Sequence, residues 1–392
     1  MSKKNGLKNR AIKYRIYPTE SQKELIINTV GCARKVFNYF LKYSEDRYKA
    51  TKNTENIEYF SCSYCIKQLP ILKKEFPYLN DVDSISLQQA IRHLDISYQN
   101  FFKKKSKFPK YKSKKYSRTS YSTVNVNNNI EVLDDYIKLP KLGKVKAIIH
   151  RNCPDGYILK SATVSMEKDL TFYCSLLYEY EQEELDYQIN IKNSIGLDYK
   201  SDGFYVDSNS DTLGSPKYFR KSQDKLAKEQ KKLSKMQGYR KGEPKSNNFK
   251  KQQIKVNKIY RHISNQRLDF VHKQSTKIAN SYDIVCVESL NLRNMSNKGF
   301  KNGKATLDNG FGMFLNLLDY KLKDKGKVLI KVDKFYPSSQ ICYTCGYKNT
   351  KTKDLKIRKV TCPCCNTTYD RDENAAKNIL KEGLRLYQES LK

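Results

Sequence analysis

The chain of 392 residues lacks any long apolar segment. A transmembrane helix needs a run of about 18 apolar residues, and no such run occurs. No apolar block near the start is typical of a signal peptide either. The sequence therefore predicts a soluble protein that does not bind or cross a membrane, and a bacterial cytoplasm is its default location.

Acidic residues are scarce relative to basic ones. Asp and Glu number 41 against 75 Lys and Arg, which gives a net charge of +34 and a pI of about 9.6. Such an excess opposes the compact state through self-repulsion unless a partner neutralises it. With membrane binding disfavoured, the expected partner is nucleic acid.

Cysteine is too sparse for a secreted disulfide scaffold, because the eleven cysteines form an odd set in a long chain. The motifs ICYTCG and TCPCC place two close pairs sixteen residues apart. This spacing is typical of a zinc ribbon, with Cys342, Cys345, Cys362 and Cys365 as ligands of one structural zinc ion. Cys364 lies within the second pair, at a spacing from Cys362 that is short for a chelate loop.

A second short motif, SCSYC, contains Cys62 and Cys65 at the same spacing. No further pair lies nearby to complete four ligands. We interpret these two cysteines as structural or as a chance pattern.

Local patterns predict several domains and an order of elements. IKYRIY is a strand that ends at Pro18, and Thr19 caps the following helix. Helical spacing covers residues 20–50 and 84–102, strands follow from 136, and a hairpin turns at Lys168 and Asp169. Further predicted features are an acidic linker at 179–188, strands within 194–211, a helical hairpin at 219–237 and 246–280, and strands in YDIVCVESL and GKVLIKVD.

Residues 103–118 contain nine basic residues and no acidic one. A run of like charge is often only solvated or disordered. Three aromatic residues interrupt this run, and stacking aromatics between basic side chains are typical of nucleic-acid binding, which we favour.

Two acids end apolar strands, because Asp198 follows SIGL and Glu288 ends IVCVE. A third, Asp372, lies in DRDENAAKNIL at a helix start, where it is interpreted as the N-cap. If the two strands are neighbours and the helix packs on their sheet, the three carboxylates converge and a divalent cation such as Mg²⁺ would offset their repulsion. For each acid taken singly, a cap or a salt bridge to one of the many lysines is the favoured interpretation. For the three acids together, in a chain this basic, we favour the metal site.

A series of motifs, in one order along nearly the whole chain, resembles the TnpB (OrfB) family of transposon-encoded proteins, which is related to the type V CRISPR effector nucleases. The motifs are KYRIYPTESQ with GCARKVFNYFL, LQQAIRHLDISYQNFFKKKSKFPKYKSK, LPKLGKVK, YFRKSQDKLAKEQKKLSK, ISNQRLDFVHKQS, VESLNLRNM, PSSQICYTCG and DRDENAAKNIL.

The resemblance implies an α/β fold with an RNase H-like (RuvC) nuclease domain at 191–335 and 369–392, interrupted by a zinc ribbon at 336–368. It also implies a β-barrel wedge domain at 1–19 and 103–182 that carries a helical recognition insert at 20–102.

The function implied by the resemblance is RNA-guided cleavage of double-stranded DNA next to a short motif, with a guide RNA made from the transposon end. Asp198, Glu288 and Asp372 match the family's catalytic acids and would hold two Mg²⁺ ions. In that framework we expect phosphate contacts from Lys110, Lys112 and Arg118, and expect Arg267 to brace either the nucleic acid or the acidic site.

This sequence departs from the family pattern in three places, none of which removes an acid. The first motif reads GLDYKSDG, Ser289 replaces a commoner Asp, and the last knuckle ends CPCCN instead of CPxCG.

Two alternative functions differ in chemistry. The first is a zinc-ribbon protein that binds RNA or DNA and regulates transposition without cleavage. The second is a transposase that uses Tyr and a histidine pair, but His93, His150, His262 and His272 form no such pair in the sequence.

Overall fold

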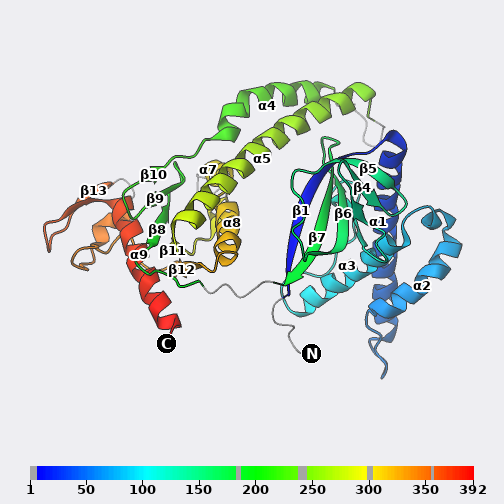
Figure 1. Cartoon of the computed structure of the whole chain (residues 1–392), viewed down its shortest axis with the longest axis horizontal. Coiled ribbons are helices and arrows are strands. Elements are labelled where there is room, and N and C mark those ends of the chain that lie inside the picture. Colours follow the sequence, from blue (N-terminus) through cyan, green and yellow to red (C-terminus); the bar gives the residue numbers. More distant parts are fainter. Residues whose placement is uncertain (1–6, 182–186, 237–244, 298–302, 355–356) are drawn as a thin grey trace. The chain divides into compact units, whose positions relative to one another are not determined.

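The chain divides into two compact units, Met1–Glu184 and Leu185–Lys392 (Figure 1). The computed structural model describes residues 7–181, 187–236, 245–297, 303–354 and 357–392. The predicted acidic linker spans the division between the units, and its residues 182–186 lie outside the described ranges. Within those ranges, no helix is long and apolar enough to cross a membrane.

The first unit contains one antiparallel sheet with the strand order β2-β6-β7-β1-β5-β4-β3. Its strands are β1 (Leu7–Tyr17), β2 (Thr119–Val124), β3 (Glu131–Val132), β4 (Tyr136–Leu139), β5 (Gly143–Ile148), β6 (Ile158–Met166) and β7 (Phe172–Glu181). β6 and β7 pair from Met166 and Phe172 outward, which confirms the predicted hairpin around Lys168 and Asp169.

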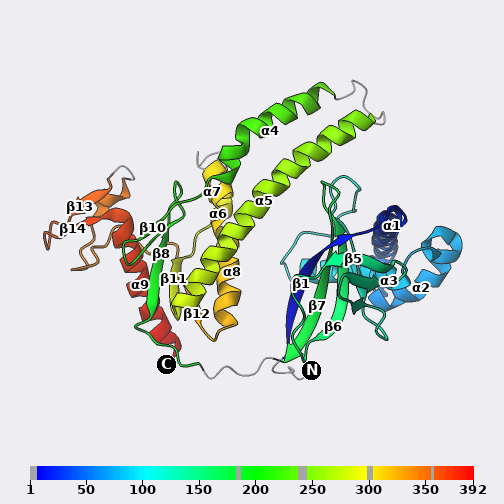
Figure 2. The same ribbon diagram turned by 45° about the horizontal axis from the view of Figure 1, so that its top comes forward.

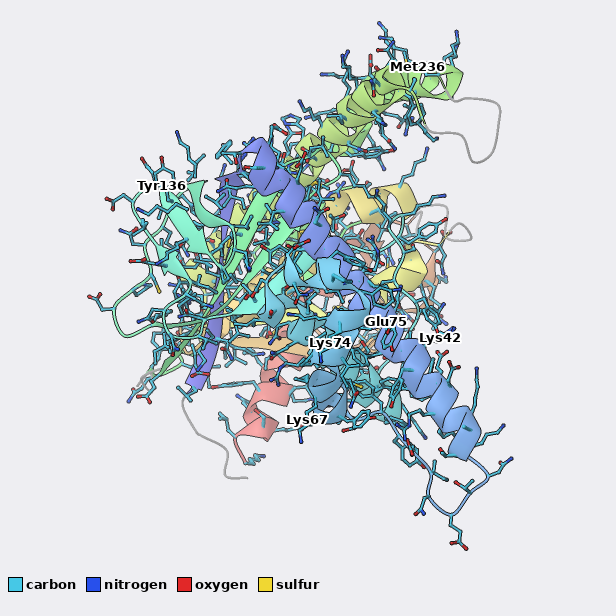
Figure 3. All side chains as sticks on the ribbon, turned by 90° about the vertical axis from the view of Figure 1, so that its right-hand side faces the viewer. Lys42, Lys67, Lys74, Glu75, Tyr136 and Met236 are labelled. Atoms are coloured by element: carbon cyan, nitrogen blue, oxygen red, sulfur yellow. The ribbon has the colours of Figure 1, made fainter. Side chains whose placement is uncertain are left out.

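Three α-helices accompany this sheet: α1 (Glu20–Thr51), α2 (Cys62–Glu75) and α3 (Ser84–Phe102), with a short 3-10 turn, η1 (Pro77–Asn80), before α3. The predicted cap is confirmed, because the Thr19 hydroxyl accepts from the Gln22 backbone N–H and the Gln22 side chain accepts from the Thr19 N–H. The apolar pattern does not predict α2, which contains Pro70. Exposed lysines of α1 and α2 are labelled in Figure 3.

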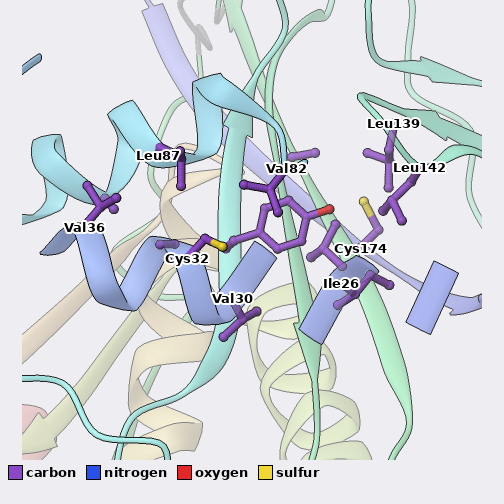
Figure 4. Packing of buried hydrophobic residues seen from close by; sticks show 14 of the residues in the cluster. Ile26, Val30, Cys32, Val36, Val82, Leu87, Leu139, Leu142 and Cys174 are labelled. Atoms are coloured by element: carbon purple, nitrogen blue, oxygen red, sulfur yellow. The ribbon is translucent and has the colours of Figure 1, made fainter. Parts of the chain in front are cut away.

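The helices and the sheet share one apolar core (Figure 4). Ile26, Val30 and Val36 enter it from α1, Leu87 from α3, and Cys174 from β7. The helical spacing of the α1 residues gives that helix one apolar face, and this face covers the sheet. Cys65 of the SCSYC motif is also buried in this core.

The second unit is built on a five-stranded sheet with the order β10-β9-β8-β11-β12. The strands are β8 (Ser194–Tyr199), β9 (Tyr205–Asp207), β10 (Thr212–Leu213), β11 (Ile284–Glu288) and β12 (Val328–Val332). β8, β11 and β12 run parallel, with Val285 opposite Ile195. The predicted neighbourhood of the strands near Ile195 and Ile284 is therefore confirmed.

Helices cover both faces of this sheet (Figure 2). The α-helices of this unit are α4 (Tyr218–Lys235), α5 (Asn247–Ser281), α6 (Leu292–Met295), α7 (Gly303–Asn309), α8 (Phe311–Lys323) and α9 (Arg371–Ser390). Val285 and Val287 pack with α5 and α8 on one face, whereas Ile284 and Cys286 pack with α9 on the other. Burial on both faces explains why IVCVE is a continuous apolar run.

Two glycines allow α9 to approach the strands closely. A Cβ on Gly196 of β8 would collide with the Ala376 carbonyl oxygen, and a Cβ on Gly383 of α9 would collide with the Cys286 sulfur. The backbones can approach this closely only because the two positions lack side chains. The start of α9 is thereby held against β8 and β11.

α4 and α5 pack against each other, as the predicted helical hairpin requires (Figure 2). Their breaker-rich connection at 237–244 lies outside the part of the chain that the structure describes. Asp308 holds the start of α4, because its carboxylate accepts from the backbone N–H groups of Phe219 and Arg220.

Candidate active site and four-cysteine cluster

The three predicted acids approach the same place from three elements. Side chains alternate along a strand, so Asp198 shares the face of Gly196, and Glu288 shares the face of Ile284 and Cys286. That face is covered by α9. Asp372 is the second residue of α9, which brings all three carboxylates to one end of the sheet.

These three acids line one pocket of about 560 Å³, as the sequence predicts. The pocket is also basic, and its cationic lining residues are Lys200, Lys334, Arg358 and Arg371. A pocket that offers both carboxylates and cations can hold divalent ions and phosphate groups.

The prediction that Asp372 caps the last helix is wrong. The N-cap is Asp370, whose extended backbone places its carboxylate to accept from the N–H groups of Asp372 and Glu373. The helix therefore starts at Arg371, and the Asp372 side chain does not serve the helix end. Its carboxylate instead accepts from Arg358 Nη1 at 3.0 and 3.2 Å and lies 3.4 Å from Lys200 Nζ.

Burial makes the other two carboxyl groups reluctant to ionise. Burial, with repulsion from Glu288 and Asp372, raises the pKa of Asp198 well above its usual range. Burial also raises the pKa of Glu288 to about 7. Groups that are costly to ionise alone are stabilised by a divalent cation, and carboxylate oxygens are the kind of ligand that Mg²⁺ prefers.

We expect the metal-free protein to lose stability as the pH rises through the raised pKa of Glu288. The folded chain holds this proton up to about pH 7, whereas the unfolded chain releases it near its ordinary pKa of 4.5. The stabilising contribution is thus fully present below about pH 4.5 and is lost as the pH passes 7. Mg²⁺ should restore stability, and more strongly at high pH.

Thermal unfolding of the wild type and of Glu288→Gln, in EDTA and in Mg²⁺ from pH 5 to pH 8, measures this effect. The variant carries no titrating group at this position, so the difference in Tm between the two proteins measures Glu288 together with its repulsion of Asp198. A difference that stays constant over the whole pH range would contradict the prediction.

The four predicted zinc ligands form a compact cluster. Their sulfur atoms all lie within 4.8 Å of one another, and among the described residues this is the one group of three or more potential metal ligands drawn together so tightly. Cys342 Sγ lies 3.7 Å from Cys365 Sγ, and Cys345 Sγ lies 3.6 Å from Cys362 Sγ. A tetrahedron with Zn–S bonds of 2.3 Å has edges of about 3.8 Å, so the sulfur set fits a zinc ion.

Each pair of cysteines lies on a tight turn of the same form. Cys342 accepts at its carbonyl from the Gly346 N–H, and Cys362 accepts from the Asn366 N–H. Gly346 and Asn366 both have positive φ, at 78° and 55°. Asn tolerates this conformation better than most residues do, which explains why CPCCN can replace the commoner CPxCG.

The remaining cysteines of interest lie outside the cluster. Cys364 is exposed, and Cys62 and Cys65 belong to no metal-ligand group within the described ranges.

The second pair of predicted zinc ligands, Cys362 and Cys365, lies in the turn of an antiparallel hairpin formed by β13 (Lys359–Thr361) and β14 (Thr368–Asp370). A short 3-10 turn, η3 (Thr350–Lys353), precedes this hairpin. β14 leads directly into α9, so the cluster is joined to the helix that carries Asp372.

Two buried asparagines fix α9 to the first cysteine turn, and sequence reasoning missed them. The Asn374 side chain donates to the Ile341 carbonyl at 2.7 Å and accepts from the Tyr343 N–H at 2.9 Å. Asn378, one helical turn later, donates to the Ser338 carbonyl at 2.8 Å. The sequence feature that could have indicated this contact is the pair of asparagines four residues apart, which lie on the apolar face of the helix in DRDENAAKNIL.

The structure brings together two of the three basic residues predicted near 110. Lys112 and Arg118 line a pocket of about 380 Å³ with Arg34, whereas Lys110 is exposed outside it. Lys112 Nζ lies 3.8 Å from the centre of the Phe37 ring, and burial lowers the pKa of its ammonium group. Phosphate contacts by these three residues stay predictions.

Arg267 does not line the acidic pocket, which was one of its two predicted targets. Its Nε donates to the Asp308 carbonyl at 2.8 Å, and its Nη2 lies 3.1 Å from Asp308 Oδ1. Asp308 is buried and also holds the start of α4, so Arg267 neutralises a structural carboxylate. A contact between Arg267 and nucleic acid stays a prediction.

Family models match three parts of the chain. One described as "Probable transposase" matches residues 175–299, and the TNB domain model of Cas12f1-like proteins matches residues 311–379. A model described as "Helix-turn-helix domain" matches residues 8–53, although here that segment forms strand β1 and the single long helix α1.

Similar proteins extend over nearly the whole chain. A Streptomyces pristinaespiralis protein named "Putative RNA-guided DNA endonuclease" is 33% identical over 96% of this chain and 89% of its own length. InsQ of Escherichia coli K12, with the same description, is 28% identical over 95% of this chain and 92% of its own. The solved structure of a Cas12f1–sgRNA–target DNA complex shares the fold, with a TM-score of 0.53 and 15% identity over 95% of this chain and 99% of that one. From its motifs, its fold and these relatives, this chain belongs to the TnpB (OrfB) family, which is related to the Cas12 effectors.

Proposed function

We propose that the chain is a transposon-associated, RNA-guided endonuclease that cleaves double-stranded DNA next to a short motif by two-metal phosphodiester hydrolysis. The observation that carries the proposal is the convergence of Asp198, Glu288 and Asp372 in one pocket, at the ends of two parallel strands and the start of a helix. Family membership and the activity in the names of two full-length relatives support it.

In this proposal the five-stranded sheet and α9 form a RuvC-like domain of the RNase H fold, at 191–335 and 369–392. The four-cysteine cluster supports the assignment of residues 336–368 as a zinc ribbon. The antiparallel sheet of the first unit, at 1–19 and 103–182, corresponds to the β-barrel wedge domain. Its helices, at 20–102, correspond to the recognition insert.

The acidic and the basic side chains of the pocket have different proposed roles. Asp198, Glu288 and Asp372 would hold two Mg²⁺ ions, which supply charge neutralisation at the attacking and leaving oxygens. Lys200 and Arg358, which contact Asp372 in the chain alone, can turn to a phosphodiester when that carboxylate binds a cation. The Asn309 side chain donates to the Ser201 carbonyl at 3.1 Å and so positions the Lys200 loop.

A further donor in the pocket is available to substrate. Arg371 Nε is buried and has no hydrogen-bond partner within the described residues, and Arg371 lines the pocket. An unpaired buried donor is costly. A phosphate oxygen of the proposed substrate would supply the missing acceptor for Arg371 Nε.

Base pairing with a guide RNA would supply sequence specificity, so the protein needs to hold mainly backbone phosphates. The net charge of +34 suits that task. This division of labour explains how one basic protein can address many DNA sequences.

Sequencing the RNA that co-purifies with the protein tests the guide. We expect one abundant transcript that covers an end of the encoding transposon and continues into flanking sequence. The same expression strain carrying a chain truncated after residue 184 controls for bulk binding of cellular RNA. A random sample of cellular transcripts bound to the full chain would overturn the guide assignment.

A further inference from the structure

An aromatic pocket of about 780 Å³ lies in the first unit, apart from the acidic site. It is bounded by the C-terminal parts of α1 and α3, by the connection before α2, and by the start of the basic segment. Seven aromatic residues line it, namely Tyr48, Tyr59, Phe60, Tyr98, Phe101, Phe102 and Phe108. Its volume is in the range of small-molecule sites.

The floor of this aromatic pocket is rigid and its rim is open. Tyr98 is 7% exposed, its hydroxyl is 2.8 Å from Ser44 Oγ, and its ring stacks with Phe60 at 5.0 Å. At the rim, Tyr59 and Phe102 are each 64% exposed. Each of these rings contacts one side of the pocket, because Phe102 stacks with Tyr98 and Tyr59 lies against Tyr48. The exposed parts of both rings remain open to a planar ligand.

The surroundings of the pocket are charged. Lys49 and Lys52 line it, and within the described residues neither forms an ion pair. The nearby basic segment begins with Lys103, Lys104 and Lys105, all exposed. Positive charge beside open aromatic rings is the combination that binds single-stranded nucleic acid, because bases stack on the rings while phosphates meet the cations.

Acceptors in the wall favour RNA over DNA. Glu45 accepts from the Tyr111 hydroxyl at 2.9 Å, and Asp95 accepts from the Gln99 amide at 2.7 Å. Each carboxylate has further lone pairs that can accept a ribose 2′-hydroxyl or a base amino group. A purely apolar occupant, such as a helix of a partner or a second copy of this chain, would bury Lys49, Glu45 and Asp95 without compensation.

We propose that this aromatic pocket stacks an unpaired nucleobase of single-stranded RNA, with Tyr59 and Phe102 as the open stacking surfaces. The proposal rests on the proposed function only for the source of that RNA. Binding requires no metal, no guide and no cleavage. Its failure can therefore be distinguished from a failure of the nuclease assignment.

The chain contains no tryptophan, so Tyr59→Trp introduces a unique fluorophore into the pocket. We expect a single-stranded RNA hexamer of adenosines, added to the full chain in EDTA, to quench this emission to saturation. An RNA duplex of equal length should leave it unchanged, because its bases are already stacked. Tyr136→Trp is the matched control, since Tyr136 is 41% exposed on β4 of the same unit and does not line the pocket.

Removing the second ring tests the stacking itself. In the Tyr59→Trp chain, Phe102→Ala should weaken hexamer binding by about tenfold, as expected for one stacked base. Ile96→Ala, a change of a 51% exposed residue elsewhere on α3, should leave it unchanged. Circular dichroism of each variant verifies that the helices remain folded.

Several results would overturn the proposal. They are unquenched Tyr59→Trp emission while the hexamer binds by anisotropy, equal binding by Phe102→Ala, or equal quenching by a deoxyadenosine hexamer. A blue shift of the emission with protein concentration alone would identify a second copy of the chain as the occupant. None of these outcomes bears on whether Asp198, Glu288 and Asp372 support cleavage.

Discussion

Asp198→Asn, Glu288→Gln and Asp372→Asn should each lower the rate of Mg²⁺-dependent DNA cleavage by about a thousandfold or more, because each loses several kcal/mol of transition-state stabilisation. The three carboxylates line one pocket. The amides keep the shape of the side chains but remove the charge that would hold the ions. Single-turnover cleavage of a DNA duplex by the guide-loaded protein measures the effect.

A matched control is Asp319→Asn, because Asp319 is paired with Lys323 on the outer face of α8 and lies outside the pocket. It should cleave at the wild-type rate. All four variants should retain guide RNA. If the three pocket variants cut as fast as the control, the chain is not this kind of nuclease, and the alternative of a binding protein that regulates transposition would replace it.

Cys362→Ser should abolish zinc binding and, with it, cleavage. Structural zinc sites contribute about 10–16 kcal/mol of binding free energy, which becomes folding free energy for the segment that they hold. Cys362 is fully buried between β13 and the other three sulfur atoms. Metal analysis of freshly reduced protein should find about one zinc per chain in the wild type and almost none in the variant.

The loss of cleavage follows from the way the cluster is joined to the acidic pocket. Asn374 and Asn378 of α9 bind carbonyls next to the first cysteine turn, and Arg358, which contacts Asp372, precedes β13. Without the metal these attachments lose their support, so Asp372 and Arg358 would no longer be held at the pocket. The effect on cleavage is therefore indirect, through position.

Cys364→Ser provides the control for this second result. Cys364 lies in the same turn but is exposed and outside the cluster, so this variant should keep its zinc and its activity. Wild-type protein without zinc, or a Cys364 variant that loses it, would contradict the assignment of the four ligands.

Much of the architecture could be predicted from local patterns. The continuous apolar run IVCVE indicated a strand buried on both faces, the capping box at Thr19 marked the start of α1, and the spacing of Cys342, Cys345, Cys362 and Cys365 predicted their cluster. The convergence of the three acids also followed from the ends of these elements. Each of these features depends on periodicity or spacing over a few residues, which the sequence records directly.

The partners of individual side chains were decided only by tertiary packing. Asp370 caps α9 in place of Asp372, Arg267 neutralises the buried Asp308, and Arg358 contacts Asp372 from the segment that precedes β13. The aromatic pocket likewise needs α1, α3 and the segment at Phe108 to meet. In a chain with 75 basic and 41 acidic residues, many ion pairs are chemically equivalent. Charge alone therefore does not determine which ion pairs form. The pairs that form depend on which backbone segments come close together, and this is decided by the packing of the apolar faces and by the glycines at 196 and 383.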